Sequence, residues 1–254
     1  MQIIETGNVA AALGVKLARA QVIAAYPITP QTPLTEKLSE FIESGEMQAE
    51  YVPVESEHSA LAVCIAASSA GARSFTATSA NGLLYMHEQI HWAAGARLPL
   101  VMCVVNRGVG APWTIWNDHQ DSISQRDTGW IQIYANDHQQ IIDSVIKAFA
   151  LAEEVMIPVM VCYDGYILSH THMPFDVPEE RLVDEFLPPY LPPYSLDPAD
   201  PALSHRPRWN STAVLKTMLT QGVRSAIAEA TEPEVTSRMP VGSENWDSLS
   251  RAQW

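Results

Sequence analysis

The sequence predicts an α/β fold, a doubly wound and mostly parallel sheet covered by helices on both faces. Helix-like stretches alternate with short β-branched or aliphatic runs over residues 7–165, and each run ends at Gly, Pro, Asn or Asp. The run LPLVMCVVNRG is almost wholly apolar, which is typical of a parallel strand buried on both faces. With 254 residues and 47% hydrophobic side chains, the chain is long enough for one large domain with a core.

The expected helices cover residues 7–20, 32–45, 56–72, 81–96 and 138–155. The expected strands alternate with them and cover residues 20–27, 49–55, 74–79, 98–108, 130–135 and 157–166. Gly45 ends the second helix. The third begins at Ser56, a residue type that caps helices, and carries Glu57 in its first turn, where negative charge is favoured. Its many small residues permit close packing on the sheet.

The composition changes after the last expected strand. We expect an α/β domain over residues 1–168 and a Pro-rich extended arm over residues 169–210, where EFLPPYLPPYSLDPADPALSHRPRWN shows no periodicity. Residues 211–254 form a C-terminal tail with one possible helix, TAVLKTMLTQGVRSAIAEA, and no assigned role.

Charge and motif content exclude several function classes. The formal net charge of −14, without a Lys/Arg-rich stripe, argues against nucleic-acid binding. No apolar run is long enough to span a bilayer, and the N-terminus lacks the pattern of a secretory signal, so we expect a cytoplasmic protein. Motifs of Rossmann dehydrogenases, phosphate-loop ATPases, zincins and serine hydrolases are absent.

The three cysteines, Cys64, Cys103 and Cys162, each lie inside an apolar run. This is typical of buried thiols in a reducing compartment. Their spacing cannot build a zinc site or an iron–sulfur cluster within one chain. We therefore expect no metal site on this chain.

The first chemical motif is the turn YPITPQTP, which contains Tyr26, Pro27, Ile28 and Thr29 and leaves a strand at its carboxyl end. Open α/β sheets bind ligands at this edge, and the prolines fix the direction of the Thr29 hydroxyl. The alternative is that Pro30 or Pro33 occupies the first position of a helix and a threonine caps it.

The second motif is VESEH, again between a strand and a helix. Glu55 and Glu57 are two residues apart and cannot share a helix face, so they are expected to have different roles. The alternative is that both acids only complement the helix dipole.

The third motif is Asn106-Arg107-Gly108, followed by NDHQD at 117–121. Arg107 comes directly after an apolar strand, where its planar guanidinium could bind a substrate carboxylate. The alternative is a structural ion pair with Asp118 or Asp121. His119 has no second histidine at ligand spacing, which favours a hydrogen-bonding loop residue over a metal ligand.

These motifs, together with FTATSANGLLYMHE, follow one another in the order and spacing of a known family. The chain resembles, over about residues 5–195, the alpha subunit of pyruvate:ferredoxin oxidoreductases and related 2-oxoacid:acceptor oxidoreductases. The resemblance implies that residues 1–168 form a thiamine-diphosphate pyrimidine-binding domain. It matches Thr29 to the active-site threonine, Glu57 to the cofactor-activating glutamate and Arg107 to the substrate-carboxylate arginine, with Tyr26, Pro27 and Ile28 also beside the cofactor.

The implied reaction is the oxidative decarboxylation of pyruvate to acetyl-CoA, or the reverse synthesis. Glu57 would hydrogen-bond N1′ of the aminopyrimidine and favour the imino tautomer that removes the thiazolium C2 proton. Electrons would then pass to iron–sulfur clusters, and coenzyme A would accept the acyl group as co-substrate.

The sequence lacks the family's Gly-Asp-Gly motif for diphosphate and magnesium, and Tyr163-Asp164-Gly165 matches it only superficially. It also lacks CxxC motifs for clusters. The resemblance therefore implies a beta subunit that carries the diphosphate and Mg²⁺ site, gamma and delta (ferredoxin-like) subunits or domains, and external ferredoxin. Thiamine diphosphate would be shared with a partner, and the [4Fe-4S] clusters would lie on partners.

Several alternatives stay open at this point. The substrate could be a branched or aromatic 2-oxoacid, 2-oxoglutarate or oxalate, and Trp113 and Trp116 could shape a pocket or cover the core. Because the chain departs from the family pattern after about residue 202, it could also be a non-catalytic truncated paralogue that acts as a scaffold or regulator. An unrelated doubly wound ligand-binding domain is the third interpretation.

Overall fold

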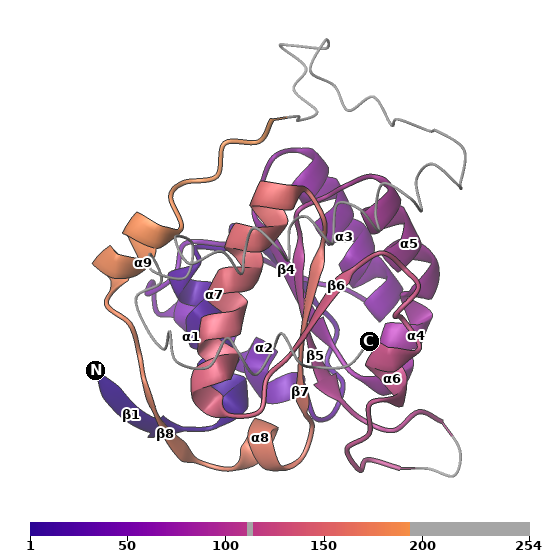
Figure 1. Cartoon of the computed structure of the whole chain (residues 1–254), viewed down its shortest axis with the longest axis horizontal. Coiled ribbons are helices and arrows are strands. Elements are labelled where there is room, and N and C mark those ends of the chain that lie inside the picture. Colours follow the sequence, from indigo (N-terminus) through magenta and orange to yellow (C-terminus); the bar gives the residue numbers. More distant parts are fainter. Residues whose placement is uncertain (111–113, 194–254) are drawn as a thin grey trace.

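The computed structural model describes residues 1–110 and 114–193, and it confirms the predicted fold class (Figure 1). A six-stranded sheet has the order β3-β2-β4-β5-β7-β6, and every neighbouring pair is parallel. Its strands are β2 (Val22–Ala25), β3 (Glu50–Pro53), β4 (Ser74–Thr78), β5 (Val101–Asn106), β6 (Ile131–Tyr134) and β7 (Val159–Asp164).

Helices cover both faces of this sheet. Figure 1 shows α1 and α7 on one side of the strands and α3 and α5 on the other. The first layer consists of α1 (Gly7–Leu17), α2 (Thr32–Glu43) and α7 (His138–Val155). The second consists of α3 (Glu57–Ser69), α4 (Ala80–Tyr85) and α5 (His87–Gly95).

The apolar run of β5 is divided between two cores. Val101, Cys103 and Val105 face the layer of α1 and α7, whereas Met102 and Val104 face the layer of α3 and α5. Alternate side chains of a strand point to opposite faces, so both sets must be apolar when both faces are buried. Each such side chain contributes about 1.5–3 kcal/mol on full burial.

The cysteines follow the same rule and are fully buried, as expected. Burial raises the pKa of the Cys64 thiol to about 12 and raises the pKa values of Cys103 and Cys162 as well. In the part of the chain that the structure describes, no group of three metal-ligating side chains occurs and no helix is long and apolar enough to cross a membrane.

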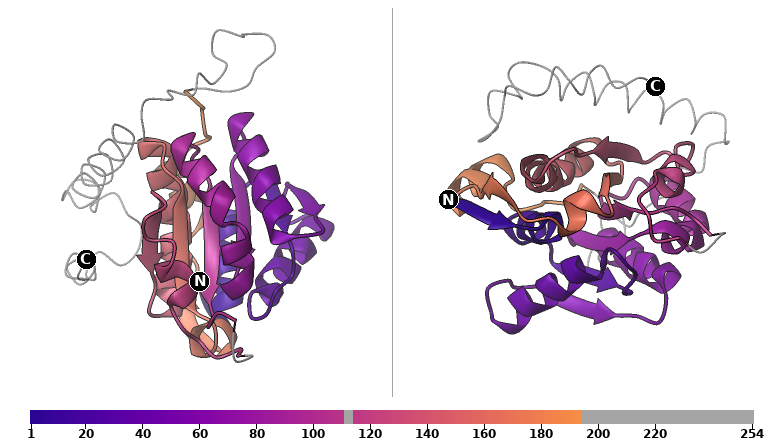
Figure 2. Two further views of the ribbon diagram at one scale, coloured as in Figure 1. Left: turned by 90° about the vertical axis from the view of Figure 1, so that its right-hand side faces the viewer. Right: turned by 90° about the horizontal axis from the view of Figure 1, so that it is seen from below.

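The segment after residue 168 differs from the expected extended arm. It contains the end of α8 (Ile167–His170), β8 (Met173–Asp176) and α9 (Glu180–Phe186). β8 pairs antiparallel with β1 (Gln2–Glu5), and the two strands lie side by side in Figure 1 and in the right view of Figure 2. Phe175, Val183 and Leu187 are buried in the core beside α1 and α7, which explains why this segment folds onto the domain.

Two further details of the prediction are corrected. The single helix expected over residues 81–96 is two helices, α4 and α5, which meet at Met86. The short helix α6 (Gln120–Ile123) was not expected. The later part of the Pro-rich arm and the possible C-terminal helix lie outside the described residues, so the proposed domain division remains a prediction.

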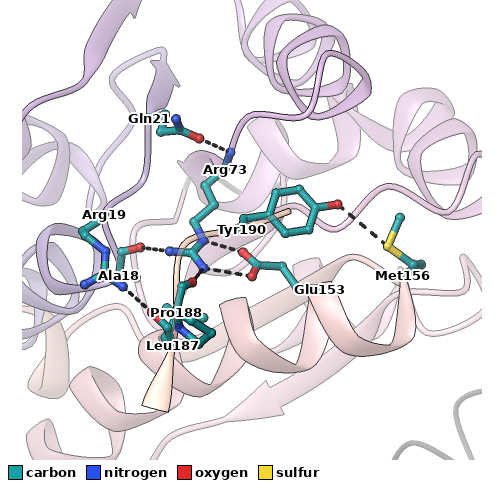
Figure 3. Close-up of polar contacts among 9 residues, drawn as sticks. All are labelled: Ala18, Arg19, Gln21, Arg73, Glu153, Met156, Leu187, Pro188 and Tyr190. Carbon is teal, nitrogen blue, oxygen red and sulfur yellow. Dashed lines mark hydrogen bonds and ion pairs between the residues drawn. The ribbon is translucent and has the colours of Figure 1, made fainter. Parts of the chain in front are cut away.

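Arg19 and Arg73, at the amino ends of the strands, form hydrogen bonds with the residues that follow α9 (Figure 3). Arg73, only 3% exposed, pairs with Glu153 through Nε–Oε1 and Nη2–Oε2 distances of 2.5 and 2.9 Å, and donates to the Ala18 carbonyl at 3.1 Å. It also donates to the carbonyl of Pro188, just as Arg19 donates to that of Leu187.

Arg73 and Glu153 form an ion pair that is largely buried. Burial raises the pKa of Glu153, and Arg73 opposes that shift through hydrogen bonding and charge. The desolvation penalty of a buried ion pair can exceed the attraction between its charges, so such a pair is weak evidence for net stability. The cluster fixes where the chain leaves α9 rather than adding much net stability.

We predict that Arg73→Met lowers the free energy of unfolding by about 3–5 kcal/mol, because Glu153 is left buried without its cation. Adding Glu153→Leu should restore most of the loss. Arg181, which pairs with Glu185 on the surface, provides the control, and Arg181→Met should cost about 1 kcal/mol or less. Urea unfolding of the variants tests this, and equal losses for Arg73→Met and Arg181→Met would contradict it.

Candidate active site at the carboxyl ends of the strands

The sheet has a topological switch point between β2 and β4. The chain passes from β2 through α2 to the edge strand β3, and then returns through α3, on the opposite face, to β4. Open α/β sheets bind ligands outside the carboxyl ends of strands at such a point. The predicted residues Thr29, Glu57 and Arg107 follow β2, β3 and β5, so the structure brings all three to this edge.

The two acids of the VESEH motif have different environments. Ser56 caps α3 by accepting a hydrogen bond from the Ser59 backbone N–H at 3.2 Å, which turns Glu57 inward. Glu57 is 8% exposed, and its carboxylate makes no hydrogen bond or ion pair with the described residues. Glu55 is exposed and accepts a hydrogen bond from the Ser59 hydroxyl. Glu57 is therefore the buried residue of the two, and its carboxylate has no partner among the described residues.

The first residues of α4 pack against Glu57. A Cβ atom added to Gly82 would lie 2.6 Å from Oε1 of Glu57 and 2.5 Å from Oγ1 of Thr78. The buried hydroxyls of Thr78 and Ser79 have no hydrogen-bond partner among the described residues. Unsatisfied buried polar groups cost about 1–3 kcal/mol each. The Thr78 hydroxyl lies beside Gly82 together with the Glu57 carboxylate, which indicates a place where a polar ligand could complete the hydrogen bonding.

The turn after β2 is held by hydrogen bonds to the domain, and most of its residues are exposed. The Pro30 carbonyl accepts a hydrogen bond from the Asn8 side chain at 3.0 Å, and Asn8 in turn accepts one from the Tyr163 hydroxyl at 2.8 Å. The Thr29–Pro30 peptide is cis. Tyr26, Pro27 and Thr29 are exposed and Ile28 is half-buried.

The capping alternative for this turn is correct in part. Pro33 does lie in the first turn of α2, but the residue before the helix is Gln31, and it forms no side-chain capping bond. Thr29 is therefore not a helix cap. Its hydroxyl makes no hydrogen bond with a described residue and is free to meet a ligand.

Arg107 is joined directly to the Thr29 turn. Its Nη1 donates to the Thr29 carbonyl at 2.6 Å, so the side chain reaches across the end of β4. Its Nε is buried without a partner, and the described residues place no carboxylate within ion-pair distance of its guanidinium. The alternative of an ion pair with Asp118 or Asp121 is therefore wrong for the guanidinium. Asp121 contacts the arginine's backbone instead.

Asp121 is the residue of this site whose role the sequence did not reveal. Its fully buried carboxylate accepts four hydrogen bonds: Oδ2 from the backbone N–H groups of Ala80 (2.9 Å) and Arg107 (3.0 Å), and Oδ1 from the Asn106 side chain (2.7 Å) and the Ser122 N–H (2.8 Å). Burial raises its pKa, and these hydrogen bonds oppose the shift. No local pattern marks such a residue.

His119 and Trp116, two further candidates from the sequence, are exposed near the candidate site. His119 is exposed and stacks edge-on against Tyr134, with ring centroids 5.3 Å apart; its ring makes no hydrogen bond with a described residue, unlike the hydrogen-bonding role expected for it. Trp116 is 63% exposed and contacts Tyr166 edge-on, so it does not cover the core. Trp113 lies outside the described residues.

Comparison with known proteins identifies related sequences. Residues 13–232 match the family model described as pyruvate flavodoxin/ferredoxin oxidoreductase, thiamine diphosphate-binding. The chain is 59% identical over 191 residues to the ketoisovalerate oxidoreductase subunit VorA of Pyrococcus abyssi, covering 75% of this chain and 48% of that protein. It is 56% identical over 199 residues to the pyruvate synthase subunit PorA of Methanocaldococcus jannaschii, covering 77% and 51%.

A solved structure is similar in fold. The 2-oxoglutarate:ferredoxin oxidoreductase from Magnetococcus marinus aligns with a TM-score of 0.73 at 21% identity, covering 91% of this chain and 46% of that one. The chain spans about half the length of the curated relatives that it matches. Because the family model covers most of its residues, the chain belongs to the pyruvate flavodoxin/ferredoxin oxidoreductase family and contains its thiamine-diphosphate-binding domain.

Proposed function

We propose that this chain provides the aminopyrimidine-activating side of a thiamine diphosphate site in a 2-oxoacid:ferredoxin oxidoreductase. The observation that carries the proposal is Glu57, a residue only 8% exposed, whose carboxylate lies against Gly82 and has no partner among the described residues. An aminopyrimidine offers a ring nitrogen that can share a proton with such a carboxylate. The missing side chain of Gly82 leaves room for Glu57 beside Thr78.

In this proposal each residue has a separate task. Glu57 would hold a proton at N1′ of the aminopyrimidine. Arg107 binds the substrate carboxylate through guanidinium N–H groups that the Thr29 carbonyl does not use. The Thr29 hydroxyl orients the keto oxygen, and Tyr26, Pro27 and Ile28 contact the cofactor. Thiamine diphosphate supplies a nucleophilic thiazolium carbon and an electron sink for decarboxylation.

We propose pyruvate as the substrate, with coenzyme A as co-substrate and ferredoxin as electron acceptor. A branched 2-oxoacid is the second candidate, because the VorA relative, named for ketoisovalerate, is 59% identical to the chain, whereas the PorA relative is 56% identical. Partner subunits would hold the diphosphate, Mg²⁺ and [4Fe-4S] clusters, as beta, gamma and delta components. Fully buried, unpaired thiols are compatible with the reducing cytoplasm in which such an assembly would work.

The test of this function is turnover by the assembled complex. The chain should be co-purified with the products of its neighbouring genes and assayed for dye or ferredoxin reduction with pyruvate, ketoisovalerate and 2-oxoglutarate plus coenzyme A. Pyruvate should give the highest kcat/KM. A complex that contains thiamine diphosphate and clusters but turns over no 2-oxoacid would favour the scaffold alternative.

We predict that Glu57→Gln lowers kcat at least about 100-fold, the size usual for loss of an acid–base group. Glu55→Gln is the matched control, because it changes the neighbouring exposed acid in the same way. That variant should stay within about twofold of the wild type, since one exposed charge is worth little. Equal effects of both substitutions would mean that Glu57 only complements the dipole of the helix.

We predict that Gly82→Ala weakens thiamine diphosphate binding by roughly 10–100-fold, because the added methyl group displaces Glu57 and costs one charged hydrogen bond. Calorimetric titration of cofactor into the cofactor-free complex measures this. Gly14→Ala, whose Cβ would lie 2.9 Å from Cβ of Val145 between α1 and α7, is the control. It should lower the melting temperature without changing cofactor affinity. A Gly82→Ala variant with wild-type affinity would contradict the packing argument.

A further inference from the structure

We infer that Asp121 is a positioning residue that sets the place of Arg107, and thereby the affinity of the site for the substrate carboxylate. The inference rests on the proposed function, in which Arg107 binds that carboxylate. Asp121 itself is fully buried, and both of its carboxylate oxygens are occupied by hydrogen bonds within the chain.

The hydrogen bonds of Asp121 join the ends of neighbouring strands. One oxygen, Oδ2, receives both the Ala80 N–H after β4 and the Arg107 N–H after β5. The other, Oδ1, accepts hydrogen bonds from the side-chain amide of Asn106, the last residue of β5, and from the backbone N–H of Ser122 in α6. A single side chain therefore fixes the spacing between two strand ends at the point where the arginine leaves the sheet.

The partners of Asp121 require a carboxylate. All four are N–H donors, and an ionised carboxylate can accept from each of them. An asparagine would keep one acceptor oxygen and direct its own N–H₂ group at two other donors. Among the described residues Asp121 forms no ion pair with a cation, so backbone and amide dipoles alone hold its buried charge.

Such an arrangement is costly for the fold. The buried charge lacks a cation partner in the described part of the chain, and the Asp121-bound Ala80 has a φ of 44°, in the left-handed region. A non-glycine residue there costs about 1–2 kcal/mol. Strained backbone of this kind gathers where function requires a fixed geometry.

Arg107 is thus held at both ends. Asp121 fixes its backbone N–H at 3.0 Å, and the Thr29 carbonyl fixes its Nη1 at 2.6 Å. A planar guanidinium binds a carboxylate well only in a narrow range of positions, and a displacement of about 1 Å can cost roughly 100-fold in rate. Moving the strand end that carries Arg107 should therefore weaken substrate binding without removing any group that touches the substrate.

A double-mutant cycle on the assembled, cofactor-loaded complex tests this coupling. The probe is oxamate, a pyruvate isostere with an amide group, whose binding calorimetry measures even when turnover is lost. Asp121→Asn should raise the Kd of oxamate and the KM of the 2-oxoacid by about tenfold, the loss expected for a displaced charged hydrogen bond. In an Arg107→Ala background the same substitution should change the Kd by less than about twofold.

Two further variants keep the test decisive. Tyr134→Phe removes a hydroxyl that donates to Ser122 at 2.9 Å, in the same buried cluster, and should leave the oxamate Kd unchanged. If Asp121→Asn does not assemble, Asp121→Glu keeps the charge but shifts both oxygens by one methylene, and it should show the same dependence on Arg107.

The outcomes separate the inference from the function on which it rests. Equal losses from the Asp121 substitution in the wild-type and Arg107→Ala backgrounds overturn the inference, because the role would then be structural only. A wild-type complex that neither turns over a 2-oxoacid nor binds oxamate overturns the proposed function, and the inference falls with it.

Discussion

A parallel sheet must be covered by apolar helices on both faces, and the rest of this structure depends on that constraint. The two cores on either side of β5 and β7 use alternate residues of the same strands, so neither strand tolerates a polar position in its middle. Polar chemistry is thereby displaced to the two ends of the strands. The amino ends hold the Arg73 cluster, and the carboxyl ends hold the candidate active site.

The two ends use buried charge differently. At the amino ends, Arg73 and Glu153 neutralise each other, and the cluster holds a neighbouring chain segment in place. At the carboxyl ends, Glu57 has no partner in the described part of the chain, and Arg107 has a buried Nε without one. Uncompensated polar groups are tolerated there because a ligand can complete them, whereas the amino ends are complete without one.

The site is built around the end of β4, although the residues with proposed chemical roles come from its neighbours. Gly82 gives Glu57 its space, Ala80 is held by Asp121, and Arg107 crosses toward the Thr29 turn from the next strand. The segments that follow β2, β3 and β5 therefore meet at the carboxyl end of β4. This arrangement gives a reason for the small residues and the left-handed backbone that follow β4: larger side chains would fill the space that the converging groups need.

The sequence by itself determined the fold class, most helices and strands, and the candidates Thr29, Glu57 and Arg107. The helices and strands follow from local rules, since hydrophobic period, capping residues and strand-end turns depend on residues close together in the chain. The choice of Thr29, Glu57 and Arg107 also needed the resemblance to a known family. Tertiary structure alone decided that β1 pairs with β8, that Arg107 contacts Thr29, and that Asp121 binds backbone rather than guanidinium. The physical reason is that strand order brings together residues up to 174 positions apart, as in the pairing of Gln2 with Asp176, and no local pattern encodes that order.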